Sequence, residues 1–161
     1  MTILVNGGFE NSTTLLAGWA DLQSPTPSCA TSVSATGGTS YVSPRTGMYQ
    51  ARTSCTTATV GAGLQQTISL NPGQIYTVTG YFNGGFNQAA TGALYINGTM
   101  IASKTTSNFD TSWHQVTAMF YAYTSLETFG FSMYSTPGVM MTMMMTTPGD
   151  GYSFWDDFSI V

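Results

Sequence analysis

The sequence predicts an all-β fold, a two-sheet antiparallel β-sandwich of jelly-roll type. Short segments of alternating polarity recur along the chain, and Gly, Pro or Asn closes each of them. Thr, Tyr, Phe and Val, which suit pleated and half-buried surfaces, are frequent. No window of about 11 residues or more keeps a 3.6-residue apolar period, so helices are not expected. The chain has 161 residues, enough for one domain with its own core, and we place that domain at 1–161.

Charged side chains are scarce in this chain. Three Lys and Arg residues stand against seven Asp and Glu residues, which gives a formal net charge of −4. Binding to nucleic acid or to an anionic membrane surface needs clustered cations, and Arg45, Arg52 and Lys104 form no cluster in the sequence. No apolar run reaches the roughly 20 residues that span a bilayer. We therefore expect neither a nucleic-acid partner nor a membrane partner.

The first half of the chain is predicted to hold short strands around one long loop. The loop, which carries Trp19, is predicted at 11–28. Strands are predicted at 3–10, 29–35, 40–43 and 48–55. Met1 and Thr2 lead directly into the first predicted strand, without a signal peptide. This favours either a cytoplasmic protein or one whose leader or neighbouring domains have been removed.

The second half shows the clearest alternation. Strand 74–82 is expected to turn Val78 and Phe82 to one face and Tyr81 to the other, because side chains alternate along a strand. Strand 113–123 is expected to separate Val116, Ala118 and Phe120 from Gln115, Thr117, Met119, Tyr121 and Tyr123 in the same way. Further strands are predicted at 63–70, 93–96, 99–103, 128–134 and 152–161. An Asn-Gly pair closes the hairpin between two of them.

A methionine-rich run occupies 139–145. A buried edge strand or core filler is the commonest use of methionine. Substitutions that carry a heavy atom for structure determination are a second interpretation. A sulfur cluster for a soft metal is the third, and a chain with one His and no nearby Cys gives it little support.

The two cysteines, Cys29 and Cys55, both lie in Thr- and Ser-rich segments that we expect to be extended. A disulfide between neighbouring strands is the favoured interpretation, and a pair of free buried thiols is the other. Asn11 and Asn97 begin glycosylation sequons, but such triplets arise easily by chance in a Thr-rich chain.

Acidic residues stand near both ends of the chain. Glu10 closes the opening stretch, and Asp156 and Asp157 lie inside an otherwise apolar last strand. A carboxylate in such a strand is costly unless a cation or dense hydrogen bonding compensates it. We expect Glu10 to meet Asp157 or Asp156 in space, with a calcium ion between them. The alternative is that these are solvated charges at strand ends.

Five short motifs carry a resemblance that spans nearly the whole chain. They are Asn-Gly-Gly-Phe-Glu at 6–10, Gly-Trp at 18–19, Leu-Asn-Pro-Gly-Gln-Ile-Tyr-Thr-Val-Thr at 70–79, Thr-Ser-Trp-His-Gln-Val at 111–116 and Phe-Trp-Asp-Asp-Phe-Ser-Ile-Val at 154–161. Their order and spacing resemble the carbohydrate-binding modules of families 4, 9 and 22. The resemblance implies a galactose-binding-like β-sandwich. It also implies a structural calcium held by Glu10, Asp157 and carbonyls near Gly8 and in the 45–48 turn, which includes Thr46.

Glycan binding is the function that the sequence favours, with a cell-wall polysaccharide of β-glucan or xylan type as the ligand. Aromatic rings pack on the C–H faces of sugars, and amide or hydroxyl groups bind sugar hydroxyls. The outer sheet face would be the concave, ligand-bearing one. The candidate contacts are Tyr81, Tyr121, Tyr123, Gln115, Gln50, Arg52, Phe86 and Tyr95. Trp19, Trp113 and Trp155 are expected to pack structurally.

Two other functions compete with glycan binding. Glycoside hydrolysis needs two carboxyl groups across one cleft, but the chain has only two glutamates, and Asp156 and Asp157 belong to the last predicted strand. The single histidine, His114, has no nucleophile at a fixed spacing. We therefore expect no enzyme. A protein-interaction or adhesion module on the same fold remains the alternative. The glycan-binding interpretation predicts a secreted, monomeric protein that is attached to other domains in its full-length form.

Overall fold

A computed structural model describes residues 3–10, 17–22, 29–35, 42–55, 62–85, 89–107, 110–136 and 151–161. Within these ranges the chain forms ten strands and no helix. The strands are β1 (Ala20–Leu22), β2 (Cys29–Ala35), β3 (Tyr49–Cys55), β4 (Ala62–Ser69), β5 (Ile75–Asn83), β6 (Ala89–Ile96), β7 (Thr99–Thr105), β8 (His114–Tyr121), β9 (Leu126–Thr136) and β10 (Gly151–Ile160).

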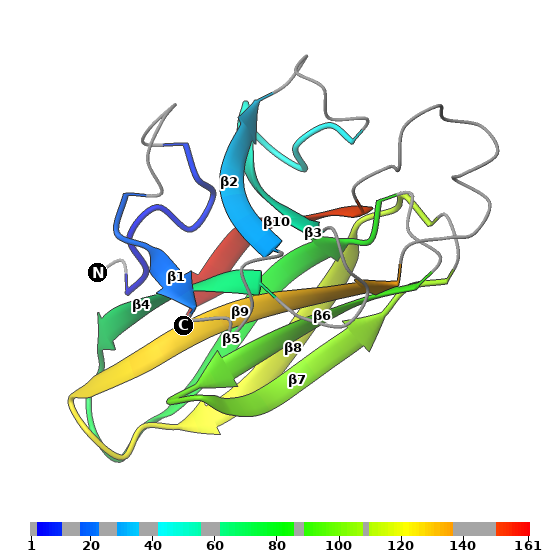
Figure 1. Cartoon of the computed structure of the whole chain (residues 1–161). Coiled ribbons are helices and arrows are strands. Elements are labelled where there is room, and N and C mark those ends of the chain that lie inside the picture. Colours follow the sequence, from blue (N-terminus) through cyan, green and yellow to red (C-terminus); the bar gives the residue numbers. More distant parts are fainter. Residues whose placement is uncertain are drawn as a thin grey trace, which may run out of the picture.

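The strands form two five-stranded sheets that pack against each other (Figure 1). The first sheet has the order β1-β4-β9-β6-β7, and the second has the order β2-β3-β10-β5-β8. Every strand pair is antiparallel. The predicted all-β sandwich is therefore confirmed. The last strand, β10, lies in the middle of the second sheet, between β3 and β5.

Aromatic rings fill the space between the sheets. Phe131 stacks on Phe158 with ring centroids 4.7 Å apart, and Trp155 stacks on Phe158 at 5.1 Å. Trp19 packs edge-on against Phe131 at 5.3 Å. Both of these tryptophans are buried, so the prediction that they pack structurally is confirmed. Trp113 lies half-buried directly before β8.

The predicted faces of β5 and β8 are confirmed. Val78 and Phe82 are fully buried, and Val116 and Phe120 point into the same core. The intervening side chains point away from the core, as the period of two requires. The outer side of the second sheet is therefore polar and aromatic where the sequence placed it.

Segment 3–10 is a run of turns and bends, so the strand predicted there is wrong. Asn6 and Phe9 adopt left-handed backbone angles, with φ of 54° and 59°, and the Phe9 N–H donates to the Asn6 carbonyl. A pleated strand accommodates neither feature. The segment nevertheless lies against the last strand, because the Phe158 N–H donates to the Gly7 carbonyl at 3.0 Å.

Smaller differences occur elsewhere in the first half. The loop predicted around Trp19 contains the short strand β1, which pairs with β4. Residues 42–43, at the end of the strand predicted at 40–43, are not in a strand. The methionine run at 139–145 lies outside the described residues. Asn97 closes the β6–β7 hairpin with φ of 49°, as its Asn-Gly sequence predicts.

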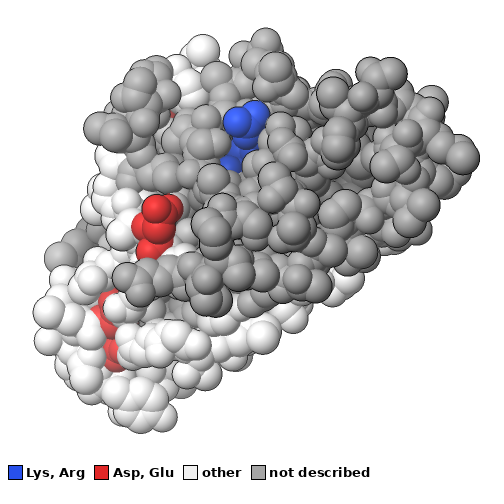
Figure 2. Space-filling model, viewed as in Figure 1, with Lys and Arg blue, Asp and Glu red and all other residues white. Residues whose placement is uncertain are grey.

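No helix among the described residues is long and apolar enough to cross a membrane. On the face shown in Figure 2, the coloured charged groups stand apart from one another.

Candidate functional site

The outer face of the second sheet brings four of the eight predicted ligand-binding residues onto one surface, namely Tyr81, Gln115, Tyr121 and Tyr123. In the register of β5 with β8, Tyr81 lies opposite Gln115 and Ile75 lies opposite Tyr121. Thr79 and Thr117 face each other between these pairs, with their hydroxyl oxygens 3.3 Å apart. One continuous strip of polar and aromatic side chains therefore runs along the β8 edge of this face.

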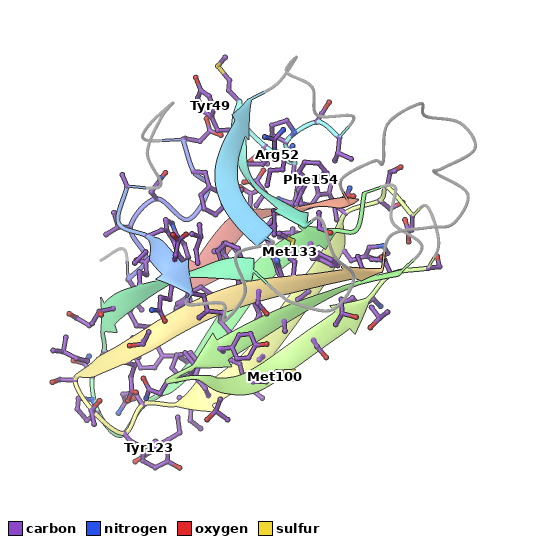
Figure 3. All side chains as sticks on the ribbon, viewed as in Figure 1. Tyr49, Arg52, Met100, Tyr123, Met133 and Phe154 are labelled. Atoms are coloured by element: carbon purple, nitrogen blue, oxygen red, sulfur yellow. The ribbon has the colours of Figure 1, made fainter. Side chains whose placement is uncertain are left out.

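Two tyrosines at the end of β8 form the most exposed part of this strip. Tyr121 is 46% exposed and Tyr123 is 80% exposed. Their rings meet edge to face with centroids 4.9 Å apart. Ile75 and Met119 are also exposed, so we call these four residues the aromatic patch. Figure 3 shows Tyr123 at the opposite end of the molecule from Arg52 and Phe154.

Tyr81 is already in contact with a cation. The guanidinium carbon of Arg45 lies 3.5 Å from the centroid of the Tyr81 ring, which is cation–π geometry. The same guanidinium donates to Asp157 at 2.7 Å. Arg45 therefore occupies one face of the Tyr81 ring. Tyr81 as a whole is half-buried.

Two further predicted contacts lie on β3. Gln50 is fully buried, and its Nε2 donates to the Val42 carbonyl at 2.7 Å. This contact holds the segment before β3 and leaves Gln50 no exposed surface. Arg52 is half-buried and lies directly opposite Phe154 of β10.

Of the other two predicted contacts, Tyr95 is not brought to this face. Tyr95 lies on β6 in the first sheet, where its hydroxyl is 3.0 Å from the Ser132 hydroxyl. Because the two sheets face away from each other on their outer sides, Tyr95 and Tyr121 are not parts of one site. Phe86 lies outside the described residues.

The predicted metal-binding residues do come together, around the turn before β3. Glu10 accepts hydrogen bonds from the N–H groups of Met48 at 3.0 Å and Tyr49 at 2.9 Å. The Thr46 hydroxyl donates to Asp157 at 2.6 Å. A Cβ at Gly8 would lie 3.5 Å from the same Asp157 carboxylate. Glu10 and Asp157 therefore bind the same turn from two sides.

Asp156 is the buried member of this acidic group. Its Oδ2 accepts from the N–H of Arg45 at 2.9 Å, and its Oδ1 accepts from the N–H of Asp157 at 2.8 Å. Burial raises the pKa of Asp156 to about 7, and the neighbouring charge of Asp157 adds to the shift. A β-bulge follows it, with Asp157 at φ 52°. This bulge directs the two consecutive carboxylates toward the same turn.

The donor set at this turn is partly suited to calcium. Glu10, Asp157 and the Thr46 hydroxyl supply oxygen atoms, which calcium prefers. Within the described ranges, no three His, Cys, Asp or Glu side chains are close enough together to hold a metal ion. An ion here would therefore depend on backbone carbonyls as well. At present the Arg45 guanidinium supplies positive charge to Asp157.

A cleft of about 470 Å³ lies between the opening segment and the end of β10. Its walls are Ile3, Leu4, Asn6, Gly7, Gly8, Glu10, Phe158, Ser159, Ile160 and Val161. The cleft confirms that the two ends of the described chain lie side by side.

Two polar arrangements were missed by sequence reasoning. His114 Nε2 lies 2.8 Å from Asp110 Oδ2, and a spacing of four residues before a strand was the available signal. Glu127 is buried, and its carboxylate accepts from the backbone N–H groups of Tyr123 and Thr124. No local pattern marks Glu127, because its partners include a residue from the distant β6–β7 hairpin.

No family model matches this sequence, and no curated protein matches it either. Solved structures do match its fold. A cyclase from Fischerella sp. TAU, in complex with 4-(1H-indol-3-yl)butan-2-one, has a TM-score of 0.66 at 17% identity, over 100% of this chain and 96% of that chain. TmCBM61, in complex with β-1,4-galactotriose, has a TM-score of 0.65 at 17% identity, over 100% and 98%.

A third match is the Clostridium thermocellum endo-1,4-β-D-xylanase 10B, as CBM22-1–GH10 modules complexed with xylohexaose. It has a TM-score of 0.61 at 16% identity, over 96% of this chain and 27% of that chain. These likenesses show that the chain has the same β-sandwich fold as these solved structures. They also show that the same architecture occurs in a cyclase, so the fold by itself does not determine whether a protein is catalytic.

Proposed function

We propose that this chain is a non-catalytic carbohydrate-binding module. Its ligand is a cell-wall polysaccharide of β-glucan or xylan type, bound along the outer face of the second sheet. The observation that carries the proposal is the exposed pair of Tyr121 and Tyr123, aligned with Gln115 and Thr117 on one strand edge.

The strip has the size and chemistry that an oligosaccharide needs. From Gln115 to Tyr121 the strand covers six residue steps, or roughly 20 Å, enough for several sugar rings. The tyrosine rings offer faces for the C–H surfaces of sugars, while Gln115 and the paired threonines offer donors and acceptors for hydroxyls. The site is proposed to extend toward Tyr81 and Arg52, where Arg45 adds donors.

The structural neighbours support the ligand class. TmCBM61 is bound to a galactotriose, and the xylanase modules are bound to xylohexaose. Both ligands are uncharged oligosaccharides. An uncharged aromatic patch suits such ligands better than it suits anionic ones.

We propose further that calcium binds at the turn before β3, through Glu10, Asp157, Thr46 and backbone carbonyls. The ion would add positive charge to a cluster in which the pKa of Asp156 is already raised. A Cys29–Cys55 disulfide, secretion, a monomeric state and attachment to further domains belong to the same proposal.

Retention in gels that contain soluble polysaccharide tests the proposed site. Wild-type protein is expected to be retarded by xylan or β-glucan, with β-1,4-galactotriose and xylohexaose as soluble competitors. Tyr121→Ala removes an exposed stacking surface, so it is expected to weaken binding at least about tenfold and to leave the melting temperature nearly unchanged.

Tyr95→Ala is the matched control, because it removes a tyrosine from the other sheet. We expect it to bind like wild type. If wild type is retarded by none of these polysaccharides, the proposed function is wrong. If Tyr95→Ala weakens binding and Tyr121→Ala does not, the site lies on the first sheet.

A further inference from the structure

Glu127 is a buried carboxylate with an unusual set of partners. It is the second residue of β9 and is 2% exposed. Its Oε1 accepts from the N–H of Tyr123 at 3.0 Å, from the N–H of Thr124 at 2.8 Å and from the Thr124 hydroxyl at 3.1 Å. Its Oε2 accepts from the side-chain amide of Asn97. One side chain therefore connects two separate turns of the chain to the start of β9.

Asn97 completes the connection. Its Oδ1 accepts from the Thr128 N–H at 2.8 Å, and its own N–H donates to the Thr128 carbonyl at 2.8 Å. The hairpin tip, the start of β9 and the turn after β8 are thereby joined. The hydrogen bonds that Glu127 accepts hold its pKa below the usual range, and the bond from the Thr124 N–H has the largest effect. The carboxylate is therefore charged at neutral pH, where it accepts strongly.

The turn that Glu127 holds carries Tyr123, the most exposed residue of the aromatic patch. Tyr123 is highly exposed and lies after the end of β8, so packing does little to fix it. A ligand that binds a mobile side chain must order it, and this ordering weakens the affinity. Two of the bonds to Glu127 are made by the backbone of Tyr123 and Thr124, which sets the direction of the Tyr123 side chain against Tyr121.

We propose that Glu127 is a positioning residue of the glycan site, which acts by fixing the turn at Tyr123 and Thr124 and so pre-forming the Tyr121–Tyr123 pair. This inference rests on the proposed function. It assigns Glu127 no contact with the ligand.

A donor–acceptor swap provides the test. In Glu127→Gln, one side-chain oxygen still accepts from the turn, but the new amide faces the amide of Asn97, so two donors oppose each other. Asn97→Asp restores an acceptor opposite the new amide, and Asp tolerates the left-handed backbone at this position. The double variant therefore regains the complementary pairing without the wild-type residues.

Two readouts are measured on all variants: retention by soluble xylan and β-glucan, and hydrogen exchange at the Tyr123 and Thr124 amides. Glu127→Gln is expected to weaken retention about fivefold, because the ligand must then order the Tyr121 and Tyr123 side chains. It is also expected to speed hydrogen exchange at the Tyr123 and Thr124 amides. The double variant is expected to recover most of both. Ile68→Val, opposite Glu127 in the strand register, lowers stability without touching these bonds and is expected to bind like wild type.

Unchanged retention and unchanged exchange in Glu127→Gln would overturn the positioning role. So would a loss of retention in Glu127→Gln that Ile68→Val reproduces in proportion to its lower stability, since stability alone would then explain it. Retention of wild type by neither polysaccharide overturns the proposed function, and the positioning role falls with it. The two failures are thus distinguished by whether wild type binds.

Discussion

At the residue scale, Asp156 illustrates how a buried carboxylate is tolerated in this fold. It is fully buried, it follows Trp155 in a core strand, and Asp157 stands next to it. Backbone N–H groups of Arg45 and Asp157 point at its two oxygens and offset part of the cost of burying a charge. The offset is incomplete, because the pKa of Asp156 remains raised to about 7.

This raised pKa predicts a pH dependence of stability. The carboxyl of Asp156 has a pKa of 3.8 in its ordinary state and of about 7 in the fold, so the native protein holds a proton that the unfolded chain releases. The free energy of unfolding is therefore expected to fall as pH rises from 4 to 7, by on the order of 3 kcal/mol. Urea unfolding in a chelator, at pH 4.5 and pH 7.5, measures the difference.

Asp156→Asn provides the control for this prediction, because it removes the titrating group. Its stability is expected to change little across the same pH window. A wild-type protein that becomes more stable between pH 4.5 and pH 7.5 would contradict the raised pKa.

The sequence predicted that Glu10 and Asp157 lie near each other, because each is a carboxylate in an apolar segment at one end of the chain. It did not predict the contact between Arg45 and Tyr81, because that contact depends on the path of the 42–48 segment over the sheet face. Gln50 was predicted as a ligand contact, but it is buried and donates a hydrogen bond to the Val42 carbonyl. The sequence shows that a side chain is polar but does not show whether it is buried.

At the element scale, alternation was the most informative signal. β5 and β8 were predicted with the correct faces, because each keeps a strict period of two and one side is buried. Segment 3–10 was predicted as a strand and is a series of turns. The left-handed angles fall on Asn6 and Phe9, which flank the Gly-Gly pair, and alternation of polarity gives no sign of them.

The pairing of β2 with β3 bears on the predicted disulfide. Cys29 lies directly opposite Cys55 in the antiparallel register. Cα atoms of such pairs are about 4.5–5.5 Å apart, within the range of about 4.4–6.8 Å that a disulfide spans. The backbone register thus supports the expectation of a bond that ties the edge strand β2 to the sheet.

A disulfide at this position predicts a redox-dependent stability. Closing a loop of this size is expected to stabilise the fold by about 3 kcal/mol. Reduction should therefore lower the melting temperature by roughly 5–10 °C. The matched control is Cys29→Ser with Cys55→Ser, which should melt like the reduced protein and ignore the reductant. Two thiols that alkylate in the unreduced, unfolded wild type would contradict the prediction.

At the scale of the whole molecule, the last strand organises the fold. β10 lies between β3 and β5. Its pairing with β3 ends at Trp155, and further along β10 the N–H of Phe158 bonds to the Gly7 carbonyl of the opening segment. The 45–48 turn, to which Glu10, Asp156 and Asp157 are hydrogen-bonded, lies where these parts meet. An ion at this junction would connect the start of the chain, the turn before β3 and the last strand.

Removal of calcium tests this junction. If an ion links these segments with a contribution of a few kcal/mol, chelation is expected to lower the melting temperature by several degrees. Glu10→Gln should weaken the site and reduce the response to the chelator. An unchanged melting temperature in a chelator, for protein first equilibrated with calcium, would speak against the ion.

The central claim is that the β8 edge of the second sheet binds a glycan, and amide chemical shifts during a titration with xylan oligosaccharides test it most directly. The account predicts shift changes concentrated at Gln115, Thr117, Tyr121 and Tyr123, with the amides around Tyr95 on the other sheet unaffected. Changes concentrated around Tyr95 and Ser132, or none at saturating oligosaccharide, would contradict it.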